Sequence, residues 1–323
     1  MAYGFVGVGI LLLLLGSEAL LHGGIGLSQR LGLSPLLIGL VVVSAATSAP
    51  ELAVALSAAK ANPDIALGCV VGGTIVNILL ILGLGALLRP LPSPPKVVFR
   101  DGGTMLAASL ALVFIAYEGW ITRLSALILL GGFVSYLIVT FITEWRHVAQ
   151  TSAMEARARC RSGDRTAGLN FFFIVVGAII LFVGARCLIN GALAVGAIYN
   201  LPQPVIGLTG VALATAVPEL VITLMAFTRR YTDAAVSHVI AANIFNLLVV
   251  LGLVGLIHPL AIAPMIAHAD IYVMAGASAL LMPLMITSWR LSRVNGLFLV
   301  ICYGGYLAFL ASRLGYLAVP HLG

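Results

Sequence analysis

Charged residues are scarce in this chain of 323 residues, because Asp, Glu, Lys and Arg together make up only 9% of it. Soluble domains carry about 25% charged and about 45–50% apolar residues. Here 61% of the residues are hydrophobic and the mean hydropathy is +1.14. The composition predicts an all-α polytopic membrane protein. The net charge of +6 does not indicate a nucleic-acid partner, because the basic residues lie between apolar runs rather than on one stripe.

The chain also lacks the motifs of several kinds of chemistry. Its four cysteines show no paired spacing, which argues against a disulfide framework or a cysteine-based metal site. There is no HExxH or GxSxG motif and no pairing of a nucleophile with a base in the apolar runs. We therefore expect no enzyme and no cofactor.

Ten apolar runs approach the roughly 20 residues that a helix needs to cross the hydrocarbon core. They lie near 4–22, 35–59, 64–88, 102–119, 124–143, 169–189, 203–228, 233–257, 267–287 and 294–314. The first run lacks a basic start, so we expect a retained helix rather than a secretory signal. The long polar stretch predicts a division into a five-helix repeat (1–143), a basic cytoplasmic linker (144–168) and a second five-helix repeat (169–323).

Most basic residues fall on one side of these spans. All but four of the 17 Lys and Arg residues follow odd-numbered spans, and the exceptions are Lys60, Arg123, Arg186 and Arg313. Positive residues favour the cytoplasmic side, so we expect both termini outside the cell and the central linker inside. Three further titratable residues at predicted span ends are expected to be solvated: Glu118, His268 and Asp270.

The two halves repeat each other. SAATSAPE at 44–51 matches ALATAVPE at 212–219 with an offset of 168 residues, and Asn77 matches Asn246 with an offset of 169. Each half has an odd number of spans, so the second half enters the membrane in the opposite direction. Inverted repeats of this kind place ion sites near the middle of the bilayer, at interrupted helices.

The repeated Thr-x-x-Pro-Glu motif predicts such a site. Pro50 and Pro218 each break a helix and release a backbone carbonyl, which is tolerated in a membrane only inside protein or a polar cavity. Glu51 and Glu219 are costly at mid-membrane, so we expect them to be functional. Two carboxylates with carbonyl and hydroxyl oxygens suit a hard cation such as Ca²⁺. A kink alone or an assembly contact is the structural alternative.

The third and eighth spans add amide side chains. Asn77 and Asn246 are candidate neutral ligands, although asparagine also joins helices by hydrogen bonds. His238, Ala242 and Asn246 share one helix face because they are four residues apart. His238 is a candidate proton-coupling group if it faces the site, and otherwise a hydrogen-bonded packing residue.

At these residues the chain resembles the cation/Ca²⁺ exchanger superfamily, within it the prokaryotic sodium/calcium exchangers, whose repeats read GTSxPE and then GSNIxN/D. The resemblance implies an antiporter of a prokaryotic inner membrane that exchanges Ca²⁺ against Na⁺ by alternating access. Helices two, three, seven and eight would surround the ions, while helices one and six slide past them. Its implied ligands are the carboxylates of Glu51 and Glu219, backbone oxygens of Thr47 and Thr215, Ser48, the carbonyls of Ser44 and Ala212, and Asn77 and Asn246.

Several positions depart from the family pattern. Hydroxyls are missing at Ala216, Gly73 and Ala242, and we expect the flank at Ala216 and Ala242 to have lost both of its hydroxyls. His238 and Cys69 stand where the family usually has Asn. The alternative is therefore an H⁺-coupled exchanger of Ca²⁺ or another divalent cation, with reduced or absent Na⁺ coupling.

Two charges lie within the presumed sliding helices, Glu18 in the first span and Arg186 in the sixth. They are expected either to form an ion pair across the axis or to lie at opposite mouths of the pathway. A channel is the competing class, although two convergent carboxylates favour tight occupancy over free passage. The expected partners are cations and the lipid bilayer, and we expect a monomer.

Overall fold

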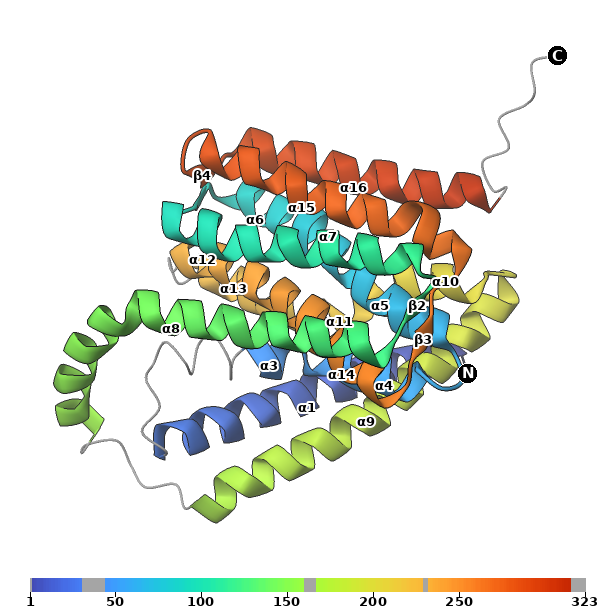
Figure 1. Cartoon of the computed structure of the whole chain (residues 1–323). Helices are drawn as coiled ribbons and strands as arrows, with labels where there is room; N and C mark the ends of the chain where they lie inside the picture. Colours follow the sequence, from blue (N-terminus) through green and yellow to red (C-terminus); the bar gives the residue numbers. More distant parts are fainter. Residues whose placement is uncertain (1, 31–43, 160–166, 229–231, 315–323) are drawn as a thin grey trace.

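The computed structural model describes residues 2–30, 44–159, 167–228 and 232–314. Within these ranges almost every residue is helical, and eight helices are long and apolar enough to cross a membrane. Their axes run side by side in a single bundle (Figure 1). The remaining two predicted spans are the interrupted segments that carry the repeated motif. The predicted all-α polytopic architecture is confirmed.

In the described part of the first half, eight helical elements precede the last span. The first six are α1 (Ala2–Arg30), α3 (Ser44–Thr47), α4 (Ala49–Ala58), α5 (Pro63–Ile75), the π-helix η2 (Val76–Ile81) and α6 (Leu82–Leu88). The π-helix η3 (Val97–Gly102) and α7 (Gly103–Tyr117) follow, and α8 (Arg123–Arg159) is the last span. Because α8 continues to Arg159, the segment expected as a linker begins as an extension of this helix.

The second half repeats this order. It consists of α9 (Ala167–Ile198), α10 (Gln203–Ile206), the π-helix η4 (Gly207–Val211), α11 (Ala212–Thr215), α12 (Val217–Thr228), α13 (Thr232–Phe245), η5 (Asn246–Val250), α14 (Leu251–Ile257), η6 (Ile266–Asp270), α15 (Ile271–Ile286) and α16 (Arg293–Arg313). The π-turns η2 and η5 stand at equivalent places, as do η3 and η6. Such turns in α-helices are frequent at functional sites.

Two very short antiparallel sheets join the halves, and the sequence does not predict them. The strand β1 (Leu91–Pro92) pairs with β4 (Arg290–Leu291), and β2 (Trp120–Ile121) pairs with β3 (Leu260–Ala261). Each sheet takes one strand from each half, and the labels in Figure 1 place the two sheets at opposite ends of the bundle. The halves are thus tied at both ends.

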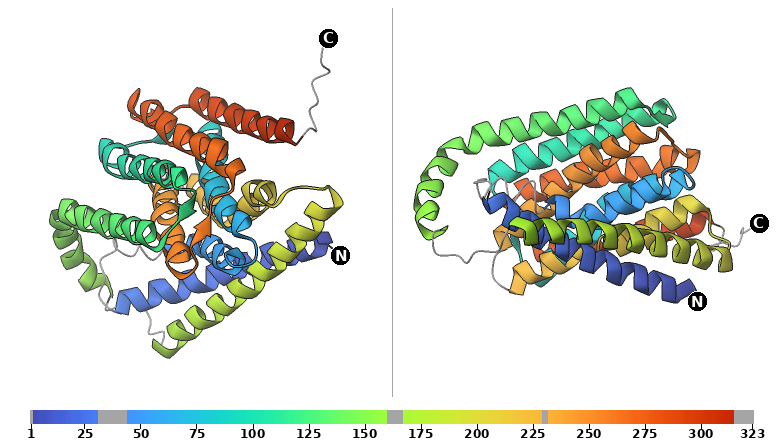
Figure 2. Two further views of the ribbon diagram at one scale, coloured as in Figure 1. Left: turned by 45° about the vertical axis from the view of Figure 1, so that its right-hand side comes forward. Right: turned by 90° about the horizontal axis from the view of Figure 1, so that it is seen from below.

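The helices α1 and α9 form an antiparallel pair on the outside of the bundle, visible in both views of Figure 2. Glycines repeat every seven residues on both facing surfaces: Gly9, Gly16 and Gly23 on α1, and Gly177, Gly184 and Gly191 on α9. A Cβ at Gly9 would lie 2.6 Å from the backbone nitrogen of Leu188, and one at Gly16 would lie 2.7 Å from Leu181 Cγ. Small residues allow this close backbone approach between membrane helices.

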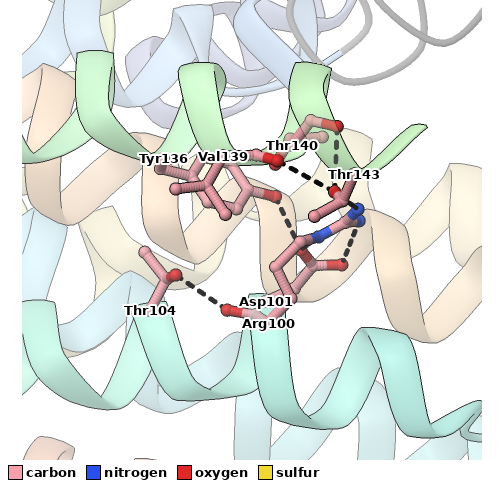
Figure 3. Close-up of polar contacts among 7 residues, drawn as sticks. All are labelled: Arg100, Asp101, Thr104, Tyr136, Val139, Thr140 and Thr143. Carbon is pink, nitrogen blue, oxygen red and sulfur yellow. Dashed lines mark hydrogen bonds and ion pairs between the residues drawn. The ribbon is translucent and has the colours of Figure 1, made fainter. Parts of the chain in front are cut away.

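Two buried acidic clusters fix the outer helices. In the first, the Asp101 carboxylate accepts a hydrogen bond of 3.0 Å from Tyr136 Oη and pairs with Arg100, whose Nε lies 2.6 Å from Asp101 Oδ1. Arg100 Nη1 also lies 3.5 Å from Thr143 Oγ1. Figure 3 shows this cluster between the start of α7 and the facing side of α8.

The second cluster lies at the equivalent place in the other half. Asp270 accepts hydrogen bonds of 3.2 Å from Tyr306 Oη and 3.2 Å from Arg313 Nη1, and Arg313 Nη2 donates to the Met265 carbonyl at 2.9 Å. Asp270 is fully buried, so the expectation that it is solvated is wrong, because Tyr306 and Arg313 compensate its charge. Glu118 and His268 are exposed as expected.

The arginine comes from a different element in each cluster. Arg100 directly precedes Asp101, whereas Arg313 lies on α16, and the positions equivalent to these arginines hold Ala269 and Thr143. The repeat therefore preserves the ion pair while its cation changes position.

A glycine exchange tests the close packing of α1 on α9. We expect Gly9→Ala to lower the melting temperature, because its methyl group would force two helix backbones apart. Gly7→Ala is the matched control, since a Cβ at Gly7 meets no atom within 4 Å. That control should leave stability unchanged or raise it by up to about 1 kcal/mol, the helix-propensity gain from Gly to Ala. Thermal unfolding in detergent distinguishes them, and equal melting temperatures would contradict this packing.

Moving the arginine tests the equivalence of the acidic clusters. Arg313→Thr should destabilise the protein by about 3–5 kcal/mol, the usual cost of leaving a buried charge unpaired. Adding Ala269→Arg should recover most of this loss, since an arginine would then precede Asp270 as Arg100 precedes Asp101. Arg293→Thr, at an exposed position of α16, is the control in the same unfolding measurement. A double variant no more stable than Arg313→Thr would disprove the equivalence.

Candidate functional site

The repeated motif interrupts two helices at the centre of the bundle, as predicted. The break between α3 and α4 lies at Ser48 (φ −84°, ψ 4°), and the break between α11 and α12 lies at Ala216 (φ −78°, ψ 0°). Pro50 and Pro218 each stand two residues further on and offer no backbone N–H, so the helix cannot pass through unchanged. Glu51 and Glu219 therefore lie in the first turns of α4 and α12, directly after the breaks, and not in the middle of a continuous helix.

The carbonyl that Pro50 releases is used to attach α1. Ser17 Oγ donates a hydrogen bond of 2.7 Å to the Ala46 carbonyl, and both residues are buried. The equivalent of Ser17 on α9 is Ala185, which has no hydroxyl for the Ala214 carbonyl. The two breaks are thus alike in backbone and unlike in their connection to the α1–α9 pair.

Glu51 and Glu219 are both fully buried, in the first turns of α4 and α12. None of their four carboxylate oxygens has a hydrogen-bond partner among the described residues. The charge of Glu51 acts on Glu219, Thr215 lies beside Glu51, and Ser48 lies beside Glu219. Each carboxylate therefore meets a hydroxyl from the opposite half.

An uncompensated buried carboxylate costs several kcal/mol, and two that repel cost more. The positive ends of the α4 and α12 dipoles offset part of this cost, typically about 0.3–1 kcal/mol each. The remainder calls for a cation or a proton between the carboxylates.

Other buried polar atoms without a partner accompany the carboxylates. Within the described ranges they include the hydroxyls of Ser44 and Ser48, Asn77 Oδ1, and both amide atoms of Asn246. No third His, Cys, Asp or Glu of the described chain joins the two glutamates in a metal-binding group. Any further ligands must then be neutral oxygens, which suits Ca²⁺ or Na⁺ better than a transition metal.

Asn77 and Asn246 are placed differently despite their equivalent positions. Asn77 Nδ2 donates to Asn243 Oδ1 at 2.9 Å. The repeat counterpart of Asn243 is Thr74, and the side-chain amide of Asn246 makes no hydrogen bond in the described structure. The sequence reading missed Asn243. Its signal was the first residue of N-I-F-N, whose repeat counterpart is the threonine of T-I-V-N.

The carbonyls expected as sodium ligands are already engaged. The Ser44 carbonyl accepts from the Ser48 N–H at 2.9 Å and from Thr47 Oγ1 at 3.1 Å. The Ala212 carbonyl accepts from the Ala216 N–H at 3.1 Å and from Thr215 Oγ1 at 3.2 Å. An ion at either carbonyl would have to displace a threonine hydroxyl.

The flanks of the site group differently from the expectation. The helix α5 packs on α11, and α13 packs on α3, so Gly73 belongs with Ala216 while Ala242 belongs with Ser48. The flank that has lost both hydroxyls is therefore the one at Gly73 and Ala216. Gly73 is buried, yet a Cβ placed there would meet no atom within 4 Å.

His238 and Cys69 also occupy equivalent positions with different contacts. Cys69 Sγ lies 3.5 Å from Thr215 Oγ1. His238 Nε2 is buried and has no partner among the described residues. The structure shows no hydrogen bond from His238 to either glutamate, so its role in proton coupling stays a prediction.

Glu18 and Arg186 do not form the ion pair that was one of two expectations. On the antiparallel pair, Leu188 lies opposite Gly9 and Leu181 opposite Gly16, so Glu18 and Arg186 are seven residues apart along the axis. At 1.5 Å per residue this is about 10 Å. Glu18 instead contacts His22, whose Nδ1 lies 3.2 Å from Oε1.

Two repeated halves, each with a broken apolar helix that carries a buried carboxylate, are typical of cation transporters. Comparison with known families agrees, since the sodium/calcium exchanger protein family matches residues 1–142 and 169–311. The chain therefore belongs to the sodium/calcium exchanger family, which consists of membrane transporters and not enzymes.

Relatives are similar over nearly their whole length. The inner membrane protein YrbG of Escherichia coli is 34% identical, covering 94% of both chains. The putative antiporter CaxA of Alkalimonas amylolytica is 30% identical over 95% of this chain and 98% of its own. The sodium/calcium exchanger MaX1 of Methanosarcina acetivorans is 28% identical over 94% and 96%. A solved structure of the sodium-calcium exchanger NCX_Mj soaked with Na⁺ is 25% identical, with a TM-score of 0.62 over 95% of this chain and 98% of its own.

A charge-removing variant tests the carboxylate pair. Glu51→Gln should raise the melting temperature in buffer without Na⁺ or divalent cations, because it removes the repulsion with Glu219. It should also abolish the stabilisation that we expect Ca²⁺ to give the wild type, about 2.7 kcal/mol at a concentration 100 times the dissociation constant. Glu118→Gln, at an exposed carboxylate, should do neither. A Ca²⁺-induced rise in Glu51→Gln equal to the wild type would contradict a shared site.

Proposed function

We propose that this chain is a secondary active antiporter that exchanges Ca²⁺ against Na⁺ by alternating access. One observation carries the proposal: Glu51 and Glu219 occupy equivalent positions in opposite halves, both fully buried, and none of their carboxylate oxygens has a hydrogen-bonding partner among the described residues. The names of MaX1 and NCX_Mj describe sodium/calcium exchangers, which supports the same ions here.

The coupling follows from a shared site. A Ca²⁺ ion neutralises both carboxylates, and Na⁺ ions would neutralise them in its place, so the two cations bind alternately. An empty site keeps like charges in a low-dielectric interior, where their repulsion is strong. Rearrangement is then favoured only with ions bound, and this restriction links the two fluxes.

The proposed ligands for Ca²⁺ are the carboxylates of Glu51 and Glu219 and the backbone oxygens of Thr47 and Thr215. Ser48 lies beside Glu219 and is the retained hydroxyl for a flanking Na⁺ site. The carbonyls of Ser44 and Ala212 and the amides of Asn77 and Asn246 complete the proposed set. Of these, Asn246 is the most available, since neither of its amide atoms has a partner in the described structure.

We also propose the orientation that the basic residues indicate, in the membrane of a prokaryotic cell with both termini outside. The α1–α9 pair is the part expected to slide. Its backbones are too close for the two helices to move past each other, so they would move together, and Ser17 connects them to the break at Ala46.

Calcium uptake into vesicles tests the function. Purified protein in vesicles loaded with Na⁺ should accumulate Ca²⁺ when diluted into Na⁺-free buffer, and Glu219→Gln should abolish this uptake. Glu118→Gln is the matched control and should transport normally. Two results would refute an antiporter and indicate a channel. One is Ca²⁺ uptake that does not depend on either the Na⁺ or the pH gradient, and the other is a current that is linear in voltage without a counter-ion.

The void at Gly73 favours a second candidate, an exchanger in which H⁺ replaces part of the Na⁺. Neither Gly73 nor Ala216 has a side-chain oxygen, so this flank has fewer oxygens for a monovalent ion than the flank that contains Ser48. A Na⁺ ion prefers a full shell of oxygen ligands, whereas a proton on the carboxylate needs none. A pH gradient would then drive Ca²⁺ uptake in Na⁺-free vesicles.

Rebuilding this flank separates the two candidates. The double variant Gly73→Ser with Ala216→Ser should strengthen Na⁺ dependence and weaken pH-driven uptake, because it adds two hydroxyl oxygens to this flank. A side chain at position 73 has space, since a Cβ there would meet no atom within 4 Å. Gly276→Ser on α15 is the control, because a Cβ placed at Gly276 would also meet no atom within 4 Å. Na⁺ dependence that is already complete in the wild type and unchanged in the double variant would reject the H⁺-coupled candidate.

A further inference from the structure

Two charged side chains in the middle of the α1–α9 pair have no part in the ion site. The Glu18 side chain is 65% exposed, and Arg186 is also exposed. Among the described residues, Glu18 pairs with His22 on the adjacent turn of its own helix. Arg186 makes no ion pair with any described residue. Both therefore lie on the outer surface of the pair.

The helix periodicity explains why these side chains face outward. Gly16 faces α9 and the next residue, Ser17, faces the core, where it binds the Ala46 carbonyl. Successive residues advance by about 100° around a helix, so Glu18 points away from both neighbours. The three equivalent residues of α9 point in the same order: Gly184 faces α1, Ala185 is buried and Arg186 is exposed.

The inverted repeat fixes the depths of the two charges. Glu18 and Arg186 are equivalent residues, so they lie at equal distances on opposite sides of the mid-plane. Their offset of about 10 Å places each about 5 Å from that plane. At this depth an arginine exposed to lipid costs at least about 2.5–3.5 kcal/mol, and intramembrane charges normally pair or face a protein interior.

We propose that a second copy of this chain covers this surface, with Glu18 of each copy paired to Arg186 of the other. A two-fold axis perpendicular to the membrane forms both pairs at once, as isologous dimers require. Side chains tilt toward the N-terminus of their helix. Both residues lie in the C-terminal half of their helix, so both tilt toward the mid-plane and the depth offset shrinks. This dimer replaces the expected monomer.

Charge exchange tests the dimer in a bilayer. Protein carrying one fluorescent protein at its C-terminus is reconstituted at low density into vesicles of phosphatidylethanolamine and phosphatidylglycerol, and bleaching steps are counted per spot. We expect two steps for the wild type, one step for Glu18→Arg and for Arg186→Glu, and two steps again for the double exchange. Arg123→Glu, which reverses an exposed charge at the start of α8, should keep two steps.

Neutral variants keep the test valid if a reversed charge prevents insertion. Glu18→Gln and Arg186→Met remove the pairs without adding repulsion, and both should lose the two-step spots while eluting as folded protein. One-step bleaching of the wild type at every protein density would overturn the proposal. One-step bleaching of a double-exchange variant that inserts into the membrane would also overturn it, as would two-step bleaching of the neutral variants. Transport is not the readout, so this outcome is independent of the ion exchanged.

Discussion

The structure depends on two like charges that the fold holds together inside the membrane. Glu51 and Glu219 come from opposite halves, are fully buried, and have no hydrogen-bond partner in the described chain. The repeat gives them equivalent positions in the two halves, and the helix breaks at Ser48 and Ala216 place each in the first turn of the following helix. The described protein residues thus provide two buried negative charges without a positive partner, so bound cations or protons must neutralise them. This requirement for an external cation is the physical basis of the exchange that we propose.

The two halves share a backbone plan but not the same side chains. Ser17 binds a released carbonyl in the first half, where the second half has only Ala185. Ser48 offers a hydroxyl beside Glu219, while its repeat counterpart Ala216 has none. The acidic clusters show that such differences can be compensated, since the arginine moves to another helix and the ion pair remains. The uncompensated differences lie at or next to the helix breaks of the proposed ion site, which favours a role in its selectivity rather than in the fold.

The sequence predicted the spans, the inverted repeat and the carboxylate pair, because hydropathy, residue spacing and the cost of charge in lipid are all local or periodic signals. It failed where the answer depended on how distant helices pack. The grouping of Gly73 with Ala216 follows from α5 packing on α11, and the burial of Asp270 from a tyrosine and an arginine about 40 residues away. The depth offset between Glu18 and Arg186 likewise comes from the helix register and not from their equivalence in the repeat.

The most direct measurement is the position of a bound divalent cation. Crystals of the protein soaked in Sr²⁺, a heavier analogue of Ca²⁺, would reveal the ion by its anomalous scattering. The account predicts one peak between the carboxylates of Glu51 and Glu219, within direct coordination distance of both. A peak elsewhere in the bundle, or an occupied structure in which the two carboxylates point apart, would contradict it.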